Sequence, residues 1–248
     1  MKNLTFLILF FCVPVLAQND SLFNKANNAY NQGDYKSAIE DYTQILKNGE
    51  TSAALYYNLA NANYKTNHIA QSVYYYEKAL QLKPGDADIQ NNLAFAQNMV
   101  IDDIKSVPES GVSKMFNNII GVWGYNGWAW SAIICCFIFG IVFLLYYFSI
   151  VPRQKRIFFS VSILALVLAI FSTVFAFHQK STIDNNLYAI VFSKEVPVRS
   201  EPNARSDEAF TLHEGTKVEV TSSFQGWTEI KLANGSEGWV QASQIKKL

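Results

Sequence analysis

Histidine is the side chain most often used for proton transfer near neutral pH, and the chain contains three. His68, His178 and His213 fall in three different regions of the sequence. No carboxylate pair, nucleophile motif, glycine-rich phosphate loop or metal-ligand spacing accompanies them. We expect His68 in a turn and His213 on a surface strand. The sequence thus predicts no catalytic residue, no metal site and no cofactor, and we expect the protein not to be an enzyme.

The cysteines offer no chemistry either. Cys12, Cys135 and Cys136 all lie inside apolar stretches, and neither polar region of the chain contains one. A disulfide framework or a zinc site is therefore not expected. Cys135 and Cys136 have no charged neighbour to activate a thiolate, so small packing residues are a better interpretation than redox chemistry.

Asparagine and tyrosine side chains in the first half of the chain point instead to binding. Amide and phenol groups can bond an extended peptide backbone, and tyrosine rings can pack on its side chains. The alternative is that the asparagines are solvated and the tyrosines fill a core. The candidates for a peptide-binding groove are Asn27, Tyr30, Asn31, Tyr57, Asn61, Tyr64, Lys65, Asn91 and Asn98.

A period of 34 residues positions these side chains. Residues 19–52 overlay on residues 53–86, which aligns Asn27 with Asn61. Within each unit the apolar residues recur at three and four positions, as expected for one buried helical face. The pattern predicts two helix-turn-helix units.

Turn and cap residues support this division. Gly33 breaks the first helical pair, and Asn67 stands at the same place in the second, where asparagine tolerates a left-handed conformation. Asp86 is expected to cap the next helix. Residues 87–104 then predict a capping helix that closes the array at residues 19–104.

The run YYNLANANYKTNHIAQSVYYYEKALQLKP, Tyr56 to Pro84, resembles the tetratricopeptide repeat, and NQGDYKSAIEDYTQIL is the matching half of the first unit. The first unit departs from the pattern with Lys25 where Leu59 stands in the second. The resemblance implies a concave groove that binds a peptide or protein. Some members hold a carboxylate with a clamp of Lys, Arg and Asn, but Lys65 alone supplies charge here.

Two apolar segments follow the repeats. Residues 128–151 and 157–177 carry no charged side chain, and about 20 apolar residues suffice to cross a bilayer as a helix. We predict two transmembrane helices. The alternative is a buried hairpin in a soluble core, although globular helices that are apolar on every face are uncommon. Neither span contains an ionisable residue, which argues against an ion or proton path.

The loop at residues 152–156 predicts the orientation. Arg153, Lys155 and Arg156 stand together without an acidic neighbour, and short loops rich in Lys and Arg remain in the cytoplasm. The segments before and after the hairpin would then share the other side. We expect a bacterial inner-membrane protein with both polar domains in the periplasm.

Residues 1–17 agree with that placement. An apolar run follows Lys2 and ends at a small-residue site, Ala17, as in a secretory signal peptide. An uncleaved anchor is the alternative. Residues 105–127, which include Trp123 and Tyr125, predict a linker followed by an interfacial aromatic segment.

The last part of the chain, residues 187–248, changes to a period of two. Val218 and Val220 alternate with polar residues, and Asn234-Gly235 is a hairpin signal between strands. Short strands at this spacing predict a small barrel.

Three sequence segments of this region resemble the bacterial SH3 domain: VPVRSEPN, FTLHEGTKVEV and GWTEIKLANGSEGWV. The resemblance implies a non-catalytic module that binds peptide or cell-wall material. Core packing is the alternative for any one of its aromatic residues, and Trp239 and Phe210 are the two suited to filling the barrel. The candidates for its binding groove are Tyr188, Phe192, Phe224, Trp227 and Trp239.

The fold class is therefore a multidomain membrane protein: an α-helical tetratricopeptide repeat array, two transmembrane helices and a small all-β SH3-like barrel. This order of parts resembles the BatE group of aerotolerance-operon proteins. That resemblance implies partnership with membrane proteins that carry von Willebrand A-type domains, in an envelope or stress-tolerance complex. Twenty acidic and twenty basic residues give no net charge, so nucleic acid is not an expected partner.

Two other functions stay open. One is a peptidoglycan-binding protein that acts through the SH3-like domain. The other is an accessory subunit of an enzyme or transporter, for which an ionisable residue inside a span is the missing feature.

Overall fold

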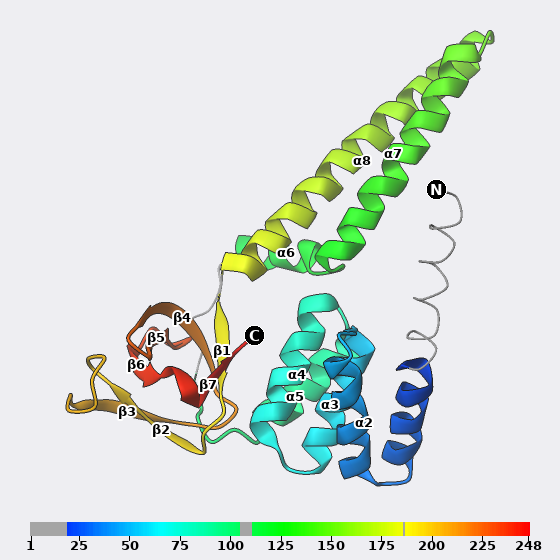
Figure 1. Ribbon diagram of the computed structural model, residues 1–248. Helices are drawn as coiled ribbons and strands as arrows, with labels where there is room; N and C mark the ends of the chain where they lie inside the picture. The colour runs from blue at the N-terminus through cyan, green and yellow to red at the C-terminus, as the bar shows by residue number, and fades with distance from the viewer. Residues whose placement is uncertain (1–18, 105–110, 186) are drawn as a thin grey trace, which may run out of the picture. The chain divides into compact units, whose positions relative to one another are not determined.

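The computed structural model describes residues 19–104, 111–185 and 187–248. The predicted signal peptide, residues 1–17, lies outside the described residues. The chain forms two compact units, which we call the first unit and the hairpin unit (Figure 1). The described part of the first unit is residues 19–80, 86–104 and 187–248, and that of the hairpin unit is residues 81–85 and 111–185.

Helical pairs make up the N-terminal part of the first unit (Figure 1). A helix over residues 19–31 is followed by α2 (Tyr35–Lys47), α3 (Ala53–Lys65), α4 (Ile69–Leu82) and α5 (Ala87–Gln97). This confirms the predicted repeat array. The capping helix is shorter than the predicted 87–104, because α5 ends at Gln97.

The predicted turn residues have the expected conformations. Gly33 has a φ of 82° and Asn67 a φ of 60°, both in the left-handed region that glycine and asparagine tolerate. The Asp86 carboxylate caps α5 by accepting hydrogen bonds from the backbone N–H groups of Asp88 and Ile89. These side chains start and stop the helices at the positions that the sequence predicts.

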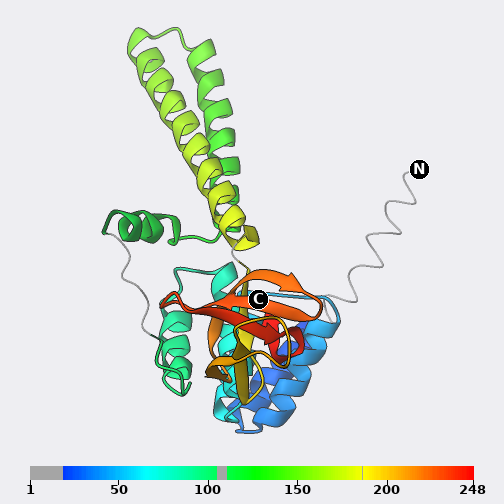
Figure 2. The ribbon, with the colours of Figure 1, turned by 90° about the vertical axis from the view of Figure 1, so that its left-hand side faces the viewer.

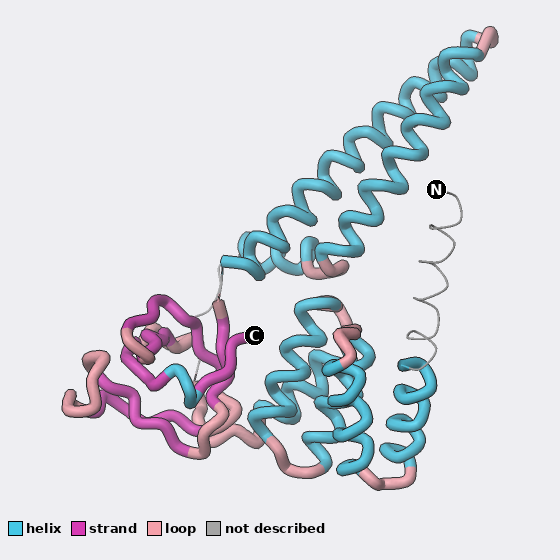
Figure 3. The backbone as a smooth tube through the Cα atoms, viewed as in Figure 1, coloured by secondary structure: helices cyan, strands magenta, loops and turns pink. Residues whose placement is uncertain are grey.

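The C-terminal part of the first unit is all-β (Figure 3). Its strands are β1 (Tyr188–Val191), β2 (Glu195–Arg199), β3 (Glu208–His213), β4 (Lys217–Phe224), β5 (Trp227–Lys231), β6 (Glu237–Gln241) and β7 (Ile245–Lys247), with a short 3₁₀ helix at Ala242–Gln244. They form one antiparallel sheet in the order β3-β2-β6-β5-β4-β1-β7. We call residues 187–248 the β module.

Alternation along its strands builds the core of the β module. Thr228 and Ile230 of β5 are buried, and so are Gly238 and Val240 of β6. The predicted hairpin turn is present, with Gly235 at a φ of 91° between β5 and β6. The outward positions of these strands are therefore left for solvent or ligands.

The β module packs against the repeat array through β1. Ala189 and Val191 join the core of the β module, whereas Ile190, on the opposite face of the strand, is buried with Tyr74 and Ala96 of the array. Both faces of β1 are thus covered. The predicted domains 19–104 and 187–248 form one compact unit rather than two separate bodies.

The segment after α5 explains why that helix is short. Val100 packs against the core of the array, and Ile104 packs against the core of the β module. An extended chain covers this distance in fewer residues than a helix does. Leaving the helix after Gln97 lets these residues join the two cores.

A glycine permits the close approach of the two parts. Gly215, in the turn between β3 and β4, has a φ of 91°. A Cβ atom at this position would lie 2.8 Å from Val100 Cγ2 and 3.0 Å from Ile69 Cγ2. Any larger residue would therefore be strained in its backbone and would push the β module from the array.

The hairpin unit consists of α6 (Gly111–Ile120), α7 (Tyr125–Phe148) and α8 (Pro152–Asn185). By length and composition, α7 and α8 are able to cross a membrane. They lie side by side (Figures 1 and 2), and Ser131 Oγ of α7 is 3.2 Å from Ser172 Oγ of α8. A buried stripe of small residues lets α8 approach α7 closely. Its members are Ser162, Ala165, Ala169 and Ser172.

The ends of these helices differ from the prediction. The predicted loop 152–156 is helical, and the helices are joined by Ser149–Val151 alone. Pro152 occupies the first position of α8, where its missing N–H costs no hydrogen bond. At the other end, residues 178–185, which follow the predicted span, continue α8. No glycine or proline interrupts them, so the backbone hydrogen bonds continue beyond the apolar stretch.

Candidate functional site

The repeat array has a cavity of about 310 Å³ on the helices that the sequence indicated. It is lined by Asn27, Tyr30, Asn31, Tyr42, Asn58 and Asn61. Four of these residues were predicted. Tyr42 and Asn58 were missed, and we call the six residues the repeat groove.

Three of the side chains that line the repeat groove are joined by hydrogen bonds. The Oδ1 atom of Asn27 accepts a hydrogen bond of 2.6 Å from the hydroxyl of Tyr42 and one of 2.9 Å from Nδ2 of Asn58. Both lone pairs of this oxygen are thereby occupied. The orientation of the Asn27 amide is fixed.

The next repeat contains the same set, displaced by 34 residues. Oδ1 of Asn61 accepts hydrogen bonds from the hydroxyl of Tyr76 at 2.5 Å and from Nδ2 of Asn92 at 3.0 Å. Asn92 Nδ2 also donates to the hydroxyl of Tyr57 at 2.8 Å. The period that identified Asn27 and Asn61 also relates Asn58 to Asn92. A full overlay of the repeats would therefore have found the three residues of each hydrogen-bonded set.

The buried phenols determine which way each amide points. Burial raises the pKa of Tyr42 to about 12. The pKa of Tyr76 is also raised, mainly by burial and in addition by electrostatic repulsion from neighbouring tyrosines. Both hydroxyls are therefore protonated donors at neutral pH, and each faces an Asn oxygen. In the part of the chain that the structure describes, Nδ2 of Asn27 and of Asn61 donates to no protein group. Two amide donors, one per repeat, remain for a ligand.

The other predicted groove residues do not line this cavity, although Tyr57 is connected to Asn61 through Asn92. Lys65 is exposed at the end of α3, Asn91 is exposed on α5, and Asn98 ends α5. Tyr64 packs against the core of the array. No charged side chain lines the repeat groove.

Three of the five predicted SH3 candidates share one outer face of the β module. Phe224 and Trp227 are paired across the tight turn between β4 and β5. Trp239 lies on the outward side of β6, opposite Glu229 of β5. Trp239 is partly exposed and Phe210 packs against the core, so of the two residues suited to filling the barrel, Phe210 does so. We call Phe224, Trp227 and Trp239 the aromatic face.

Tyr188 and Phe192 lie elsewhere, on the side of β1 that meets the array. The ring of Phe192 packs edge-on against Tyr74, with centroids 5.7 Å apart. The ammonium of Lys246 lies 4.3 Å from the Tyr74 ring centroid and 5.5 Å from that of Phe192. The ring of Tyr188 is covered by Lys217, whose Nζ is 4.6 Å from its centroid. These aromatics hold the first unit together.

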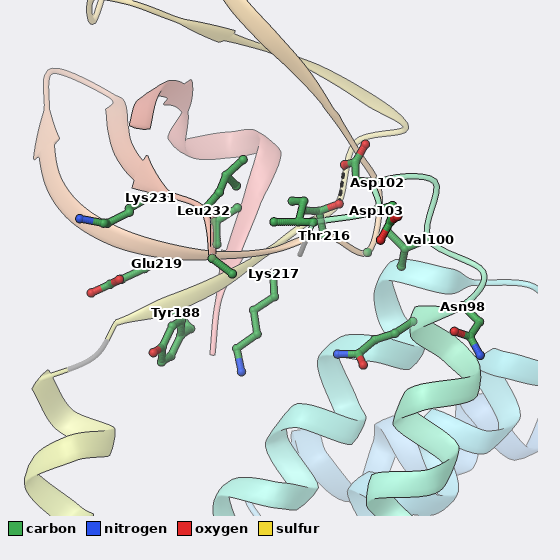
Figure 4. A pocket seen from close by; sticks show the side chains of 15 residues that line it. Asn98, Val100, Asp102, Asp103, Tyr188, Thr216, Lys217, Glu219, Lys231 and Leu232 are labelled. Carbon is green, nitrogen blue, oxygen red and sulfur yellow. Dashed lines mark hydrogen bonds between the residues drawn. The ribbon is translucent and has the colours of Figure 1, made fainter. Parts of the chain in front are cut away.

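A second cavity, of about 600 Å³, lies where the segment after α5 meets the β module (Figure 4). One wall is formed by Asn98, Asp102 and Asp103, and the other by strands β1, β4 and β5. Lys217 on the second wall forms an ion pair with Glu77 of α4, with Nζ 2.7 Å from Oε2. The cavity belongs to the contact between the array and the β module.

Asp102 is the central residue of this contact. Its Oδ2 accepts hydrogen bonds from the backbone N–H of His213 at 2.7 Å and from the Thr216 hydroxyl at 2.5 Å, the latter drawn in Figure 4. Its Oδ1 lies 2.7 Å from His213 Nδ1. Burial alone would raise the pKa of Asp102, but the hydrogen bonds from Thr216 and His213 outweigh it and lower the pKa. His213 lies at the end of strand β3, as predicted, and its partly exposed side chain also takes part in this internal contact.

Neither cavity gathers the side chains that a metal ion requires. Among residues 19–104, 111–185 and 187–248, no three His, Cys, Asp or Glu side chains come together in a way that could hold one. His68 lies in the turn before α4, as predicted, and its Nδ1 pairs with the Thr66 hydroxyl at 2.8 Å.

Two family models match the chain. The tetratricopeptide repeat model matches residues 23–87. The bacterial SH3 domain model matches residues 194–246. No curated protein matches the chain. Both matched modules are typically non-catalytic and bind other molecules. The chain therefore combines a helical array similar to tetratricopeptide repeats, two helices able to span a membrane and an all-β module similar to the bacterial SH3 domain.

Proposed function

We propose that the protein is a non-catalytic, membrane-anchored adaptor whose repeat groove binds an extended segment of a partner protein. The observation that carries this proposal is the pair of oriented amide donors on Asn27 and Asn61. An extended peptide presents backbone carbonyls that such donors can bond. The groove thus recognises a peptide backbone and requires little of its sequence.

The chemistry of the groove favours an uncharged stretch of peptide. Its lining is made of Asn and Tyr side chains, with no cation to hold a terminal carboxylate. Tyr30 supplies a flat apolar ring beside the amides, on which a bulky side chain can pack. An internal segment of a partner, rather than its C-terminus, suits these properties.

We place both domains of the first unit on the periplasmic face of a bacterial inner membrane. Support comes from Arg153, Lys155 and Arg156, which stand at the connected ends of α7 and α8 and favour a cytoplasmic turn. A hairpin with its turn inside returns the chain to the side from which it came. The repeat groove and the aromatic face then serve the same compartment.

The partner that we favour is another membrane or periplasmic protein. The order of repeats, hairpin and SH3 domain resembles the BatE group, which supports partnership with proteins carrying von Willebrand A-type domains in an envelope or stress-tolerance complex.

Asn27→Asp and Asn61→Asp test the groove. Each substitution keeps the oxygen that accepts from the buried tyrosine and replaces the free N–H donors by an acceptor. The full chain in detergent, carrying both changes, should recover less of its partner from membranes than the unmodified protein. Asn28→Asp, one position along the same helix and exposed, is the control for added charge. Equal recovery by all three proteins would refute binding through the groove.

The aromatic face supports a second function, binding of peptidoglycan by the SH3 domain. Phe224 is 52% exposed and lies beside Trp227, so two rings are available for stacking on a sugar or a peptide. The full chain should then sediment with purified peptidoglycan, and Trp227→Ala should weaken this while leaving recovery through the groove unchanged. Absence of sedimentation would reject this function.

A further inference from the structure

Helix α6, Gly111–Ile120, lies within the segment predicted as linker and interface. Four of its apolar residues form two adjacent pairs four positions apart, Met115 with Phe116 and Ile119 with Ile120. At 100° per residue these four positions fall on one face of the helix, and the helical period places positions 114, 117 and 118 on the other. The sequence of α6 is therefore amphipathic.

One flank of the apolar face attaches α6 to the hairpin. The ring of Phe116 packs edge-on against Phe175 and His178 of α8, with centroids 6.2 Å and 5.8 Å away. The carbonyl of Ile120 accepts a hydrogen bond of 2.8 Å from Nε1 of Trp128 on α7. These contacts fix the position of α6 on both helices.

The other flank is uncovered. Met115 is 64% exposed and Ile119 is 47% exposed. Val122 and Trp123, which follow the helix, are 61% and 49% exposed. Four exposed large apolar side chains within nine residues are costly in water and indicate a binding partner.

The position of α6 along the hairpin, next to the ends of the uncharged stretches, indicates which partner covers this surface. Phe175 and His178 lie on either side of Phe177, where the uncharged stretch of α8 ends. Trp128 begins the uncharged stretch of α7. It lies at the same position along the hairpin as Phe175, because the centroids of the two rings are 5.0 Å apart. Aromatic residues gather at this boundary between hydrocarbon and headgroups. Figure 2 shows α6 lying across the end of the hairpin rather than along it.

We propose that α6 is an interfacial helix that lies in the plane of the membrane surface, with Met115, Ile119, Val122 and Trp123 inserted among the lipids. A helix at this boundary buries its apolar face at the junction of headgroups and acyl chains and keeps its polar face in water. The inference rests on the proposed function, because it requires α7 and α8 to span the bilayer. It adds a third membrane contact, which holds the start of α7 at the surface.

Depth-dependent fluorescence quenching tests this inference. Single cysteines replace Met115, Ile119, Ile141 or Glu40 in a background whose native cysteines are alanine, and each carries an environment-sensitive dye. The protein is reconstituted into vesicles of phosphatidylcholine and phosphatidylglycerol. A spin label is attached to the lipid chains either near the headgroup or near the chain end. Ile141 is exposed in the middle of α7, and Glu40 is exposed on α2.

The dyes at 115 and 119 should be quenched most by the label near the headgroup, the dye at 141 most by the deep label, and the dye at 40 by neither. Quenching at 141 without quenching at 115 and 119 would overturn the interfacial helix alone. If the dyes at 115 and 119 show blue-shifted emission without lipid quenching, a protein covers them and the inference is also wrong. Absence of quenching at 141 would instead refute the spanning hairpin.

Discussion

The carboxylate of Asp102 holds His213 twice, through the backbone N–H at 2.7 Å and through Nδ1 at 2.7 Å, although 111 residues separate the two in sequence. This pair connects the end of the repeat array to the end of β3. Thr216 completes the contact by donating to the same carboxylate. The two binding modules are therefore joined directly, as well as through the hairpin unit.

Asp102→Asn should destabilise the first unit. The amide retains an acceptor but loses the charge that strengthens the hydrogen bonds from His213 and Thr216. We expect a loss of about 1–3 kcal/mol in the free energy of unfolding, measured by urea denaturation of the full chain in detergent. Asp103→Asn, at the neighbouring exposed position, is the control. An equal effect of both substitutions would show that the carboxylate of Asp102 has no special role.

The contribution of Asp102 should depend on pH. Because its pKa is lower in the folded protein than the ordinary value of 3.8, its stabilising effect is fully present above pH 3.8 and is lost as pH falls through the lowered pKa. Urea denaturation of wild type and Asp102→Asn should give a large difference at pH 7 that shrinks in strong acid. A difference that stays constant down to pH 2.5 would contradict the lowered pKa.

The repeats and the β module should unfold together. Ile190 is fully buried between them, so Ile190→Ala removes side-chain packing from both and should cost about 2–5 kcal/mol. Leu187→Ala, at an exposed neighbouring position, is the matched control. Circular dichroism follows the helices, and hydrogen exchange follows β1 and β4. Loss of protection in the strands while the helical array keeps its stability would show that the two parts are independent.

The orientation of the hairpin can be measured with a membrane-impermeant maleimide on cells whose inner membrane is intact. Cysteines that replace Glu40 of the array and Ala204 of the β module should react with the reagent once the outer membrane is permeabilised. A cysteine at Gln154, which leaves Arg153, Lys155 and Arg156 in place, should react only after the inner membrane is permeabilised. Labelling of Gln154→Cys from outside would reverse the proposed topology.

Much of this architecture follows from local rules. The 34-residue period, with Gly33 and Asn67 at equivalent turns, defines the helical pairs because left-handed backbone positions select those residue types. Alternation in β5 and β6 likewise predicts which side chains face outward. The donor pattern of Asn27 was missed because a repeat overlay gives the position of a side chain and not the direction of its amide.

The contact between the modules could not be predicted from the sequence. The sequence YAIV predicts a short apolar strand. It does not indicate that Ile190 faces the array while Ala189 and Val191 face the β module. Likewise, residues 87–104 continue a helical pattern, yet Val100 and Ile104 leave the helix to join two cores. Tertiary packing overrides local propensity at both places.

The central claim is that the repeat groove holds a partner at the membrane, and photocrosslinking in intact cells tests it most directly. A photoreactive amino acid replaces Tyr30 in the groove or, as control, Asn28 on the exposed side of the same helix. Tyr30 should give a discrete adduct with a membrane or periplasmic protein, and the adduct should disappear when Asn27→Asp and Asn61→Asp are added. No adduct from Tyr30, or one equally strong from Asn28 and unchanged by the aspartates, would contradict the account.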